Sequence, residues 1–183
     1  MGTAPAIFSK SNLRRDLIVT TFVTVGNATQ PFKRLLDGVA GIIATLPQPV
    51  IVQRGSTPFS GHGYKSVQFM EMEQFGRLVE TAELLIMHGG AGSIIHAVQA
   101  GKIPVVMPRR AKYQEIVDDH QVEFTYALAE SGKVVLAMEP VDLEKAIADA
   151  LASQSNNHLS PTPPELVRLI DEKLKNYAMQ FKV

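Results

Sequence analysis

The sequence predicts an α/β protein with a doubly wound parallel sheet of the Rossmann-like kind. Short apolar segments rich in valine, isoleucine and leucine alternate with longer amphipathic segments along most of the chain. This alternation is typical of a parallel sheet that carries helices on both faces. Glycine-rich or polar loops follow the predicted strands, as expected where the carboxyl ends of parallel strands form a ligand crevice. The length, 183 residues, fits one domain with a sizeable core.

The elements follow from the apolar patterns and from the residues that interrupt them. Strands are predicted at residues 17–25, 50–53, 65–70, 84–87, 103–107 and 133–138. Helices are predicted at residues 32–46, 71–82, from 94 up to the glycine at 101, and at 113–131 and 140–152. Pro47 and Pro49 end the first helix, and Gly132 is expected just past the end of the fourth.

Composition divides the chain into a central domain and flanking segments. Residues 1–16 show no clear periodicity and are interpreted as an N-terminal arm, and residues 17–154 form the predicted Rossmann-like domain. Residues 155–164, rich in asparagine, serine and proline, predict a linker. Residues 165–183 predict a C-terminal helix, whose apolar positions either pack on the sheet or cross to another domain.

Charge and cysteine content argue against several classes of protein. Eighteen basic and eighteen acidic residues give a formal net charge of zero, so bulk electrostatics do not indicate a nucleic-acid partner or an anionic membrane surface. The chain has no cysteine, which excludes disulfides. No apolar run approaches the roughly 20 residues of a membrane helix, and no signal-peptide core precedes the first strand. We therefore expect a cytoplasmic protein.

The chain is organised around a glycine-rich corner between a predicted strand and a helix. The sequence HGGAGS occupies residues 88–93. Glycines let a ligand approach the backbone closely, and the N–H groups and dipole of a helix N-terminus attract anions. The spacing matches neither the dinucleotide fingerprint nor the P-loop, and a tight turn without a ligand is the alternative. His88 could contact a phosphate or sugar, or only fix the loop.

A second polar loop follows the next predicted strand. Arg109, Arg110 and Lys112 form either a phosphate-binding patch or a solvated loop. The acidic and polar run from Glu115 to Gln121 comes next, and its aspartates could also be groups that favour a helix start. Two consecutive polar loops at strand carboxyl ends predict a ligand site.

The segments HGGAGSIIHAVQAGK, PVVMPRR and YQEIVDDHQ resemble the donor-binding, C-terminal domain of glycosyltransferase family 28, including its small split subunits. The resemblance covers about residues 17–138 and implies a single domain equivalent to the C-terminal half of a GT-B glycosyltransferase. It implies the catalytic subunit of a two-component enzyme of exopolysaccharide or capsule biosynthesis. Such an enzyme moves a sugar from a UDP-sugar to an acceptor linked to polyprenyl pyrophosphate.

The resemblance also assigns residues to the parts of the donor. The pyrophosphate would contact His88, Gly89, Gly90, Ala91, Gly92 and Ser93. The nucleoside and sugar would contact Gly26, Asn27, Phe69, Met70, Glu115, Asp119, His120 and Gln121. Asn27 could instead cap the next helix, and Phe69 could be ordinary core. His96 departs from the relatives, several of which have a glutamate that holds the ribose hydroxyls. Either Glu115 substitutes or the ribose is held elsewhere, and His96 is interpreted as a surface histidine.

The catalytic requirements beyond donor binding are expected from elsewhere. No Asp-x-Asp motif occurs, and a helix N-terminus can stabilise a leaving UDP without a metal, so no obligatory cofactor or metal is expected. The resemblance implies a membrane-anchored partner subunit that binds the lipid-linked saccharide, supplies the general base and brings the chain to the cytoplasmic membrane. A non-catalytic stabilising subunit and another UDP-sugar enzyme, such as an epimerase, are the alternatives. A valine in place of Gly90 is expected to fill the phosphate space and to demand an unusual backbone angle.

Overall fold

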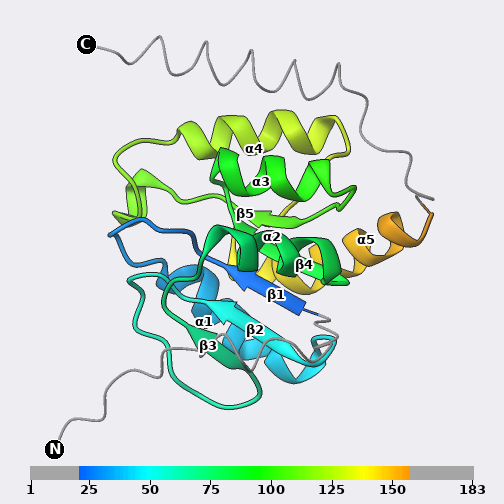
Figure 1. The fold of residues 1–183 in the computed structure, drawn as a ribbon. Coiled ribbons are helices and arrows are strands. Elements are labelled where there is room, and N and C mark those ends of the chain that lie inside the picture. The colour runs from blue at the N-terminus through cyan, green and yellow to red at the C-terminus, as the bar shows by residue number, and fades with distance from the viewer. Residues whose placement is uncertain (1–20, 157–183) are drawn as a thin grey trace, which may run out of the picture.

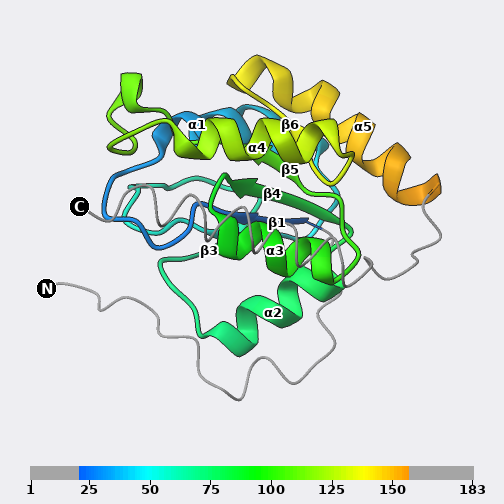
Figure 2. The same ribbon diagram turned by 90° about the horizontal axis from the view of Figure 1, so that it is seen from above.

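A computed structural model describes residues 21–156, which form a six-stranded, fully parallel sheet with helices on both faces (Figures 1 and 2). The strand order is β3-β2-β1-β4-β5-β6, the order of a doubly wound Rossmann domain. Each strand is hydrogen-bonded in parallel to its neighbour. The predicted fold class is confirmed.

The elements have the following bounds. The strands are β1 (Thr21–Thr24), β2 (Val50–Gln53), β3 (Lys65–Val67), β4 (Leu84–His88), β5 (Val105–Met107) and β6 (Val135–Leu136). The α-helices are α1 (Lys33–Ile42), α2 (Met72–Thr81), α3 (Ala91–Gln99), α4 (His120–Glu130) and α5 (Leu143–Asn156). Short 3-10 helices are η1 (Ile43–Thr45), η2 (Ala111–Tyr113) and η3 (Pro140–Asp142).

Two predicted helix boundaries are wrong, and both errors concern the loops at the carboxyl edge of the sheet. Helix α3 begins at Ala91 rather than at residue 94, so the glycine-rich corner supplies its first turn. The helix predicted from residue 113 begins only at His120. Gln114 has a φ of 58°, which ends η2, and the Glu115 side chain points inward to an ion pair. The chain therefore turns at this point instead of continuing as a helix.

The predicted segments outside the central domain are only partly covered. Helix α5 runs to Asn156, so the first two residues of the predicted linker are helical. The predicted N-terminal arm, the rest of the linker and the C-terminal helix lie outside the described residues. Within residues 21–156, no helix has both the length and the apolar character needed to cross a bilayer.

The central strands are buried on both faces, which explains their almost continuous apolar sequences. Val23 and Ile86 belong to the core that α1 and α5 cover. Phe22 and Leu85, the alternating neighbours on the same strands, belong to the core beneath α2 and α3. Phe22 and Leu85 are also paired across β1 and β4. The packing therefore fixes the ends of β1 and β4 side by side in the middle of the sheet.

A buried ion pair ties the loops at the carboxyl edge together. Arg34 of α1 donates from Nε and Nη2 to the two carboxylate oxygens of Glu115, at 3.0 and 2.8 Å. Its Nη1 and Nη2 also donate to the carbonyls of Met138 and Pro108, at 2.6 and 2.7 Å. The side chains of Arg34 and Glu115 are 10% and 5% exposed. One guanidinium thus joins α1 to the segments that follow β5 and β6.

Arg109, at the end of β5, links the same edge to the loop after β1. Its side chain is 1% exposed, and Nη1 donates to the carbonyls of Gln30 and Glu115 at 2.8 and 3.0 Å. Nη2 donates to the carbonyl of Val25 at 3.0 Å. Burial lowers the pKa of Arg109 to about 10, so the group remains charged at neutral pH. Arg109 was predicted to belong to a phosphate-binding patch or to a solvated loop. In the structure it is a buried residue whose hydrogen bonds hold these loops together.

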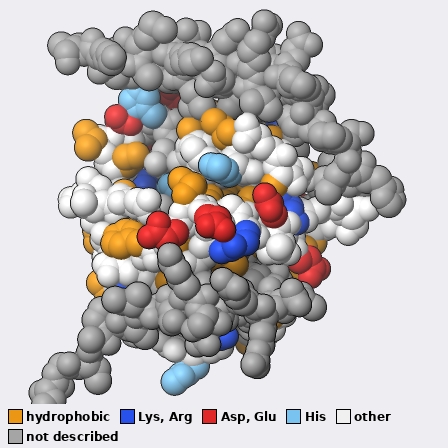
Figure 3. All heavy atoms as spheres, viewed as in Figure 1, with side chains coloured by type: hydrophobic (Ala, Val, Ile, Leu, Met, Phe, Trp, Pro, Cys, Tyr) orange, Lys and Arg blue, Asp and Glu red, His pale blue; other side chains and the backbone are white. Residues whose placement is uncertain are grey.

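We predict that Glu115→Ala destabilises the fold by about 3 kcal/mol, because it removes the buried carboxylate that is hydrogen-bonded to Arg34 and leaves only the more exposed Glu139, at 3.8 Å, as a counter-ion. The control is Glu73→Ala, which removes the exposed pair with Arg77 on the outer face of α2, where charged side chains of both signs lie at the surface (Figure 3). That change should cost less than about 0.5 kcal/mol. Urea unfolding of both variants measures the difference. Equal costs would show that the buried pair is not a structural tie.

Candidate functional site

A cavity of about 310 Å³ lies where the carboxyl ends of β1 and β4 meet. Its walls come from the loops after β1, β3 and β4, from the end of β2 and from helices α2 and α3. The lining residues are Gly26, Asn27, Gln53, Met70, Met72, Phe75, His88, Gly90, Gly92, Ser93 and His96. This position is the topological switch point of the sheet, where doubly wound domains bind their ligands.

The start of α3 forms one wall of the cavity. Gly90 is the N-cap residue, and no side chain among the described residues makes a capping hydrogen bond. The first intrahelical bond runs from the N–H of Ile94 to the carbonyl of Gly90, at 3.1 Å. The N–H groups of Ala91, Gly92 and Ser93 therefore have no intrahelical acceptor, and no acidic side chain lies in this turn. These amides and the helix dipole make the wall suitable for an anion.

The loop after β1 forms the facing wall, and a chain of hydrogen bonds orders it. Thr24 donates its hydroxyl to Oε1 of Gln53 and accepts the N–H of Gly26 at 3.2 Å. Nε2 of Gln53 donates to Oδ1 of Asn27 at 2.8 Å. Gln53 is buried, so its amide is held by these two contacts. Asn27, predicted as a ligand contact or a helix cap, is thereby oriented at the cavity rim.

His88 fills the space between the two walls. Its ring packs so closely that a Cβ at Gly90 would lie 2.2 Å from Nε2, and a Cβ at Gly26 would lie 2.5 Å from it. Burial, and then the charge of Arg109, lower the pKa of His88 to about 4, so the imidazole is neutral at physiological pH. The histidine fixes both loops, one of the two roles that the sequence left open.

The glycines of the corner differ in what a side chain would meet at each position. Gly90 has a φ of −75°, which any residue adopts, so the expectation of an unusual backbone angle there is wrong. The His88 ring, rather than a backbone angle, excludes a side chain. A Cβ at Gly89 would lie 2.9 Å from Cβ of Gln121, whereas a Cβ at Gly92 would meet nothing within 4 Å. Only Gly92 combines an open Cβ direction with a place on the cavity wall.

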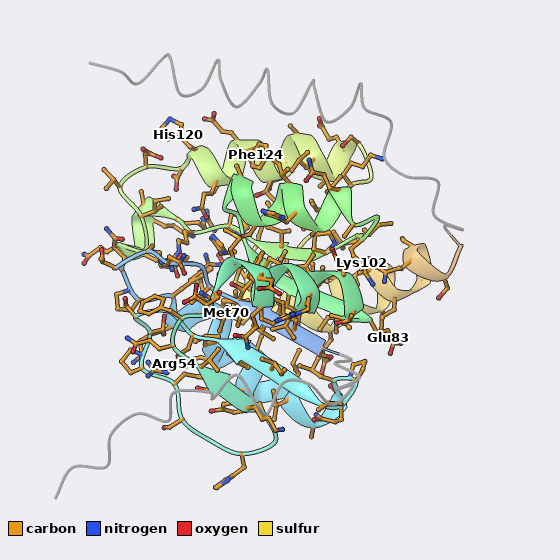
Figure 4. All side chains as sticks on the ribbon, in the orientation of Figure 1. Arg54, Met70, Glu83, Lys102, His120 and Phe124 are labelled. Carbon is orange, nitrogen blue, oxygen red and sulfur yellow. The ribbon has the colours of Figure 1, made fainter. Side chains whose placement is uncertain are left out.

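The opposite end of the cavity is apolar. Met70 (labelled in Figure 4) and Met72 lie at the start of α2, and Phe75 follows on its first turns. The ring of His96 meets the Phe75 ring edge-on, with 6.0 Å between centroids. Phe69 does not line the cavity, and it is 50% exposed, so the alternative that it belongs to the core is wrong. This end offers thioether and aromatic surface to a flat, weakly polar group.

The other predicted contacts lie outside the cavity lining, in the loop between β5 and α4 and in the first turn of α4. Oδ1 of Asp119 accepts the N–H of Ala111 at 2.8 Å, and His120 is hydrogen-bonded to Asp118. Oε1 of Gln121 accepts the N–H of Arg109 at 3.1 Å. Both carboxylate oxygens of Glu115 are engaged by Arg34, so this residue has a structural task. Gly89 and Ala91 likewise fall outside the lining, although they flank it.

Four lining residues were not among the predicted contacts: Gln53, Met72, Phe75 and His96. Gln53 had a recognisable signal, since it is a polar residue that ends an apolar strand at the carboxyl edge. Phe75 lies on the core face of α2, and this face also reaches the cavity. His96 is on the surface, as interpreted, but at the mouth of the cavity.

We predict that the glycine at position 90 is required by the His88 ring. Gly90→Ala should destabilise the protein by about 2 kcal/mol through overpacking, and the cost should nearly vanish in a His88→Ala background, where the new methyl group has room. Gly26→Ala is the comparison: its clash with the His88 ring should also be relieved by His88→Ala, but its φ of 75° should keep a strain of about 1 kcal/mol in either background. Urea unfolding of the double-mutant cycle provides the measurement. An unchanged cost at position 90 after His88 is truncated would refute the assignment.

His88 also predicts a pH dependence of stability. Its pKa is about 6.5 unfolded and about 4 folded, so the unfolded chain binds the proton more tightly. The contribution of the neutral His88 to the free energy of unfolding is therefore fully present above pH 6.5. It is lost as the pH falls to about 4, and the loss is at most about 3 kcal/mol. His88→Asn should flatten this part of the profile. Unfolding free energies measured between pH 7 and pH 4 give the comparison, and parallel profiles for the two proteins would contradict a neutral buried imidazole.

Comparison with known proteins places this geometry in a family. The sequence profile described as the glycosyltransferase family 28 C-terminal domain matches residues 20–173. A search among curated proteins finds no match. The fold is similar to solved glycosyltransferase structures. One is CalG4, the calicheamicin glycosyltransferase, with 17% identity over 90% of this chain and 46% of that chain and a TM-score of 0.55.

Two further structures show the same relationship. SnogD from Streptomyces nogalater is 18% identical over 93% of this chain and 49% of that chain, with a TM-score of 0.54. MurG from Acinetobacter baumannii is 17% identical over 87% of this chain and 51% of that chain, with a TM-score of 0.51. The chain thus spans about half the length of these proteins, and it corresponds to the C-terminal half of a GT-B glycosyltransferase. It belongs to glycosyltransferase family 28.

Proposed function

We propose that this chain is the donor-binding catalytic subunit of a two-component glycosyltransferase that uses a UDP-sugar. The observation that carries the proposal is the composition of the switch-point cavity. One wall is an uncapped helix N-terminus, and the far end is lined by Met70 and Phe75. These surfaces match the two chemical halves of a nucleoside diphosphate, the anionic pyrophosphate and the flat base.

The pyrophosphate would lie against the first turn of α3. The amides of Gly92 and Ser93, with the Ser93 hydroxyl, are the donors at this wall, and Asn27 lies across from them. Because His88 is neutral, the positive potential comes from the amides and the helix dipole. We propose that these suffice for donor binding without an obligatory metal or other cofactor.

The same donors would act in the chemical step. An acceptor hydroxyl attacks the anomeric carbon of the sugar, and the bond from that carbon to the β-phosphate oxygen breaks. The electron pair leaves with UDP, where the α3 amides stabilise the growing negative charge. The hydroxyl proton passes to a general base. We place that base on the acceptor-binding partner, as the resemblance to the family implies.

Exposed apolar side chains support a partner at the carboxyl edge of the sheet. Of the six large hydrophobic residues exposed among those described, only Tyr126 lies within a long helix away from this edge. The other five follow the carboxyl ends of β3, β5 and β6, and they are Phe69, Met72, Tyr113, Val117 and Val141. These residues flank the cavity edge on both sides, after β3 and after β5 and β6, where a covering domain would bury them.

We infer that the covering domain belongs to a membrane-anchored subunit that binds a saccharide linked to polyprenyl pyrophosphate, as in exopolysaccharide or capsule biosynthesis. A GT-B enzyme needs a second α/β domain to close the cleft and exclude water. The resemblance of the sequence to the small split subunits of the family supports a separate partner. The neutral overall charge gives no reason to expect a nucleic-acid partner.

The donor site predicts UDP binding by the isolated chain in the presence of EDTA. Gly92→Val should weaken this binding roughly tenfold or more, because it adds a side chain to the cavity wall at a position where its Cβ meets no other protein atom. The matched control is Gly41→Val, another helical glycine with open space, which lies in α1 outside the cavity. Calorimetry measures affinity, and thermal melting should give similar shifts for both variants. Binding that requires magnesium, or equal affinities of the two variants, would overturn the site.

The two-component proposal predicts little sugar transfer by the chain alone. Purified chain, UDP-sugar donor and a lipid pyrophosphate-linked saccharide should give product only when the acceptor-binding subunit is added. Product is measured by chromatography of the lipid fraction. Full turnover by the single chain would refute the need for a partner. Retained UDP binding without turnover in the complete mixture would favour the non-catalytic, stabilising subunit.

A further inference from the structure

His96 lies on the cavity wall one helical turn beyond Ser93. If the proposed function holds, the phosphates lie at the start of α3 and the base lies against Met70 and Phe75. The ribose, which joins the two, must then pass the second turn of α3. The His96 ring occupies this stretch, because it shares the wall with Ser93 and meets the edge of Phe75 at 6.0 Å. His96 is therefore the side chain that faces the ribose hydroxyls.

The chemistry of an imidazole differs from that of the usual ribose contact. Rossmann-type sites commonly hold the ribose with an acidic side chain, whose two oxygens can accept hydrogen bonds from both neighbouring hydroxyls. A neutral imidazole offers one acceptor nitrogen and one N–H donor. It can therefore satisfy one hydroxyl, whereas a carboxylate can hold the pair.

The side-chain amide oxygens that line the cavity and the Glu115 carboxylate are already engaged. Oε1 of Gln53 accepts the Thr24 hydroxyl, and Oδ1 of Asn27 accepts the Gln53 amide. The Glu115 carboxylate, considered from the sequence as a substitute, binds Arg34 and the N–H of Arg110. Among the described residues that line the cavity, none is an aspartate or glutamate.

We propose that His96 is a specificity-determining residue. It makes the donor site tolerant of nucleotides whose sugar lacks the 2′-hydroxyl group. The site binds 2′-deoxyribonucleoside diphosphates nearly as well as ribonucleoside diphosphates. Because no aspartate or glutamate among the described residues lines the cavity and His96 is itself exposed, loss of the 2′-hydroxyl leaves no buried carboxylate or imidazole without its partner at this position. A site with a carboxylate at this position would instead lose roughly tenfold or more in affinity for the deoxy compound.

The test compares the affinities of UDP and 2′-deoxy-UDP by calorimetry on the full chain. Wild type should bind the two within about threefold of each other. His96→Glu should introduce a preference for UDP of roughly tenfold. Because both ligands carry the same charge, repulsion of the new carboxylate cancels in their ratio. Gln99→Glu is the matched control, since it adds the same charge at an exposed position further along α3, outside the cavity lining.

The possible outcomes distinguish a failure of the inference about His96 from a failure of the donor site on which it rests. A wild-type preference for UDP of tenfold or more would overturn the tolerance while leaving the donor site intact. An unchanged ratio in folded His96→Glu, or the same change in Gln99→Glu, would show that His96 does not face the ribose. Failure of both nucleotides to bind at millimolar concentration would refute the donor site itself.

Discussion

The parallel pairing of β1 with β4 at the centre of the sheet is the constraint on which the site depends. Phe22 and Leu85 face each other across this pair, yet the helices that follow the two strands cover opposite faces, α1 with one core and α3 with the other. The chain therefore leaves a gap at the carboxyl ends of these strands. His88 occupies part of that gap, and its contacts with Gly26 and Gly90 fix the separation of the loops.

Burial of polar groups gives the edge around the cavity its rigidity. The guanidinium groups of Arg34 and Arg109 replace water as partners for carbonyls in the loops after β1, β5 and β6. Such groups are stable inside a protein only when they are paired and hydrogen-bonded, and Glu115 supplies the counter-charge for Arg34. These ion pairs and hydrogen bonds thus offset the free-energy cost of burying the charged groups. They do not involve the amides in the first turn of α3, which therefore stay available to a ligand.

The sequence predicted the sheet well because its strands are buried on both faces and so carry continuous apolar runs. It also located the corner at Gly90 and Gly92, since glycines between a strand and a helix reflect a local backbone requirement. The loop around Glu115 could not be predicted. Whether a polar residue faces solvent or a buried arginine depends on Arg34, which lies 81 positions away in the chain. His96 was placed at the surface correctly, but its place at the cavity depends on the packing of α2 beside α3.

The central claim is that a nucleoside diphosphate lies with its phosphates at the first turn of α3 and its base against the start of α2. The most direct measurement is a titration of the ¹⁵N-labelled chain with UDP, followed by amide chemical shifts. The largest changes should occur at the amides of Gly92 and Ser93, with further changes at Gly26 and Met70. Changes concentrated instead at the start of α4, around Gln121, with the α3 amides unmoved, would contradict the account.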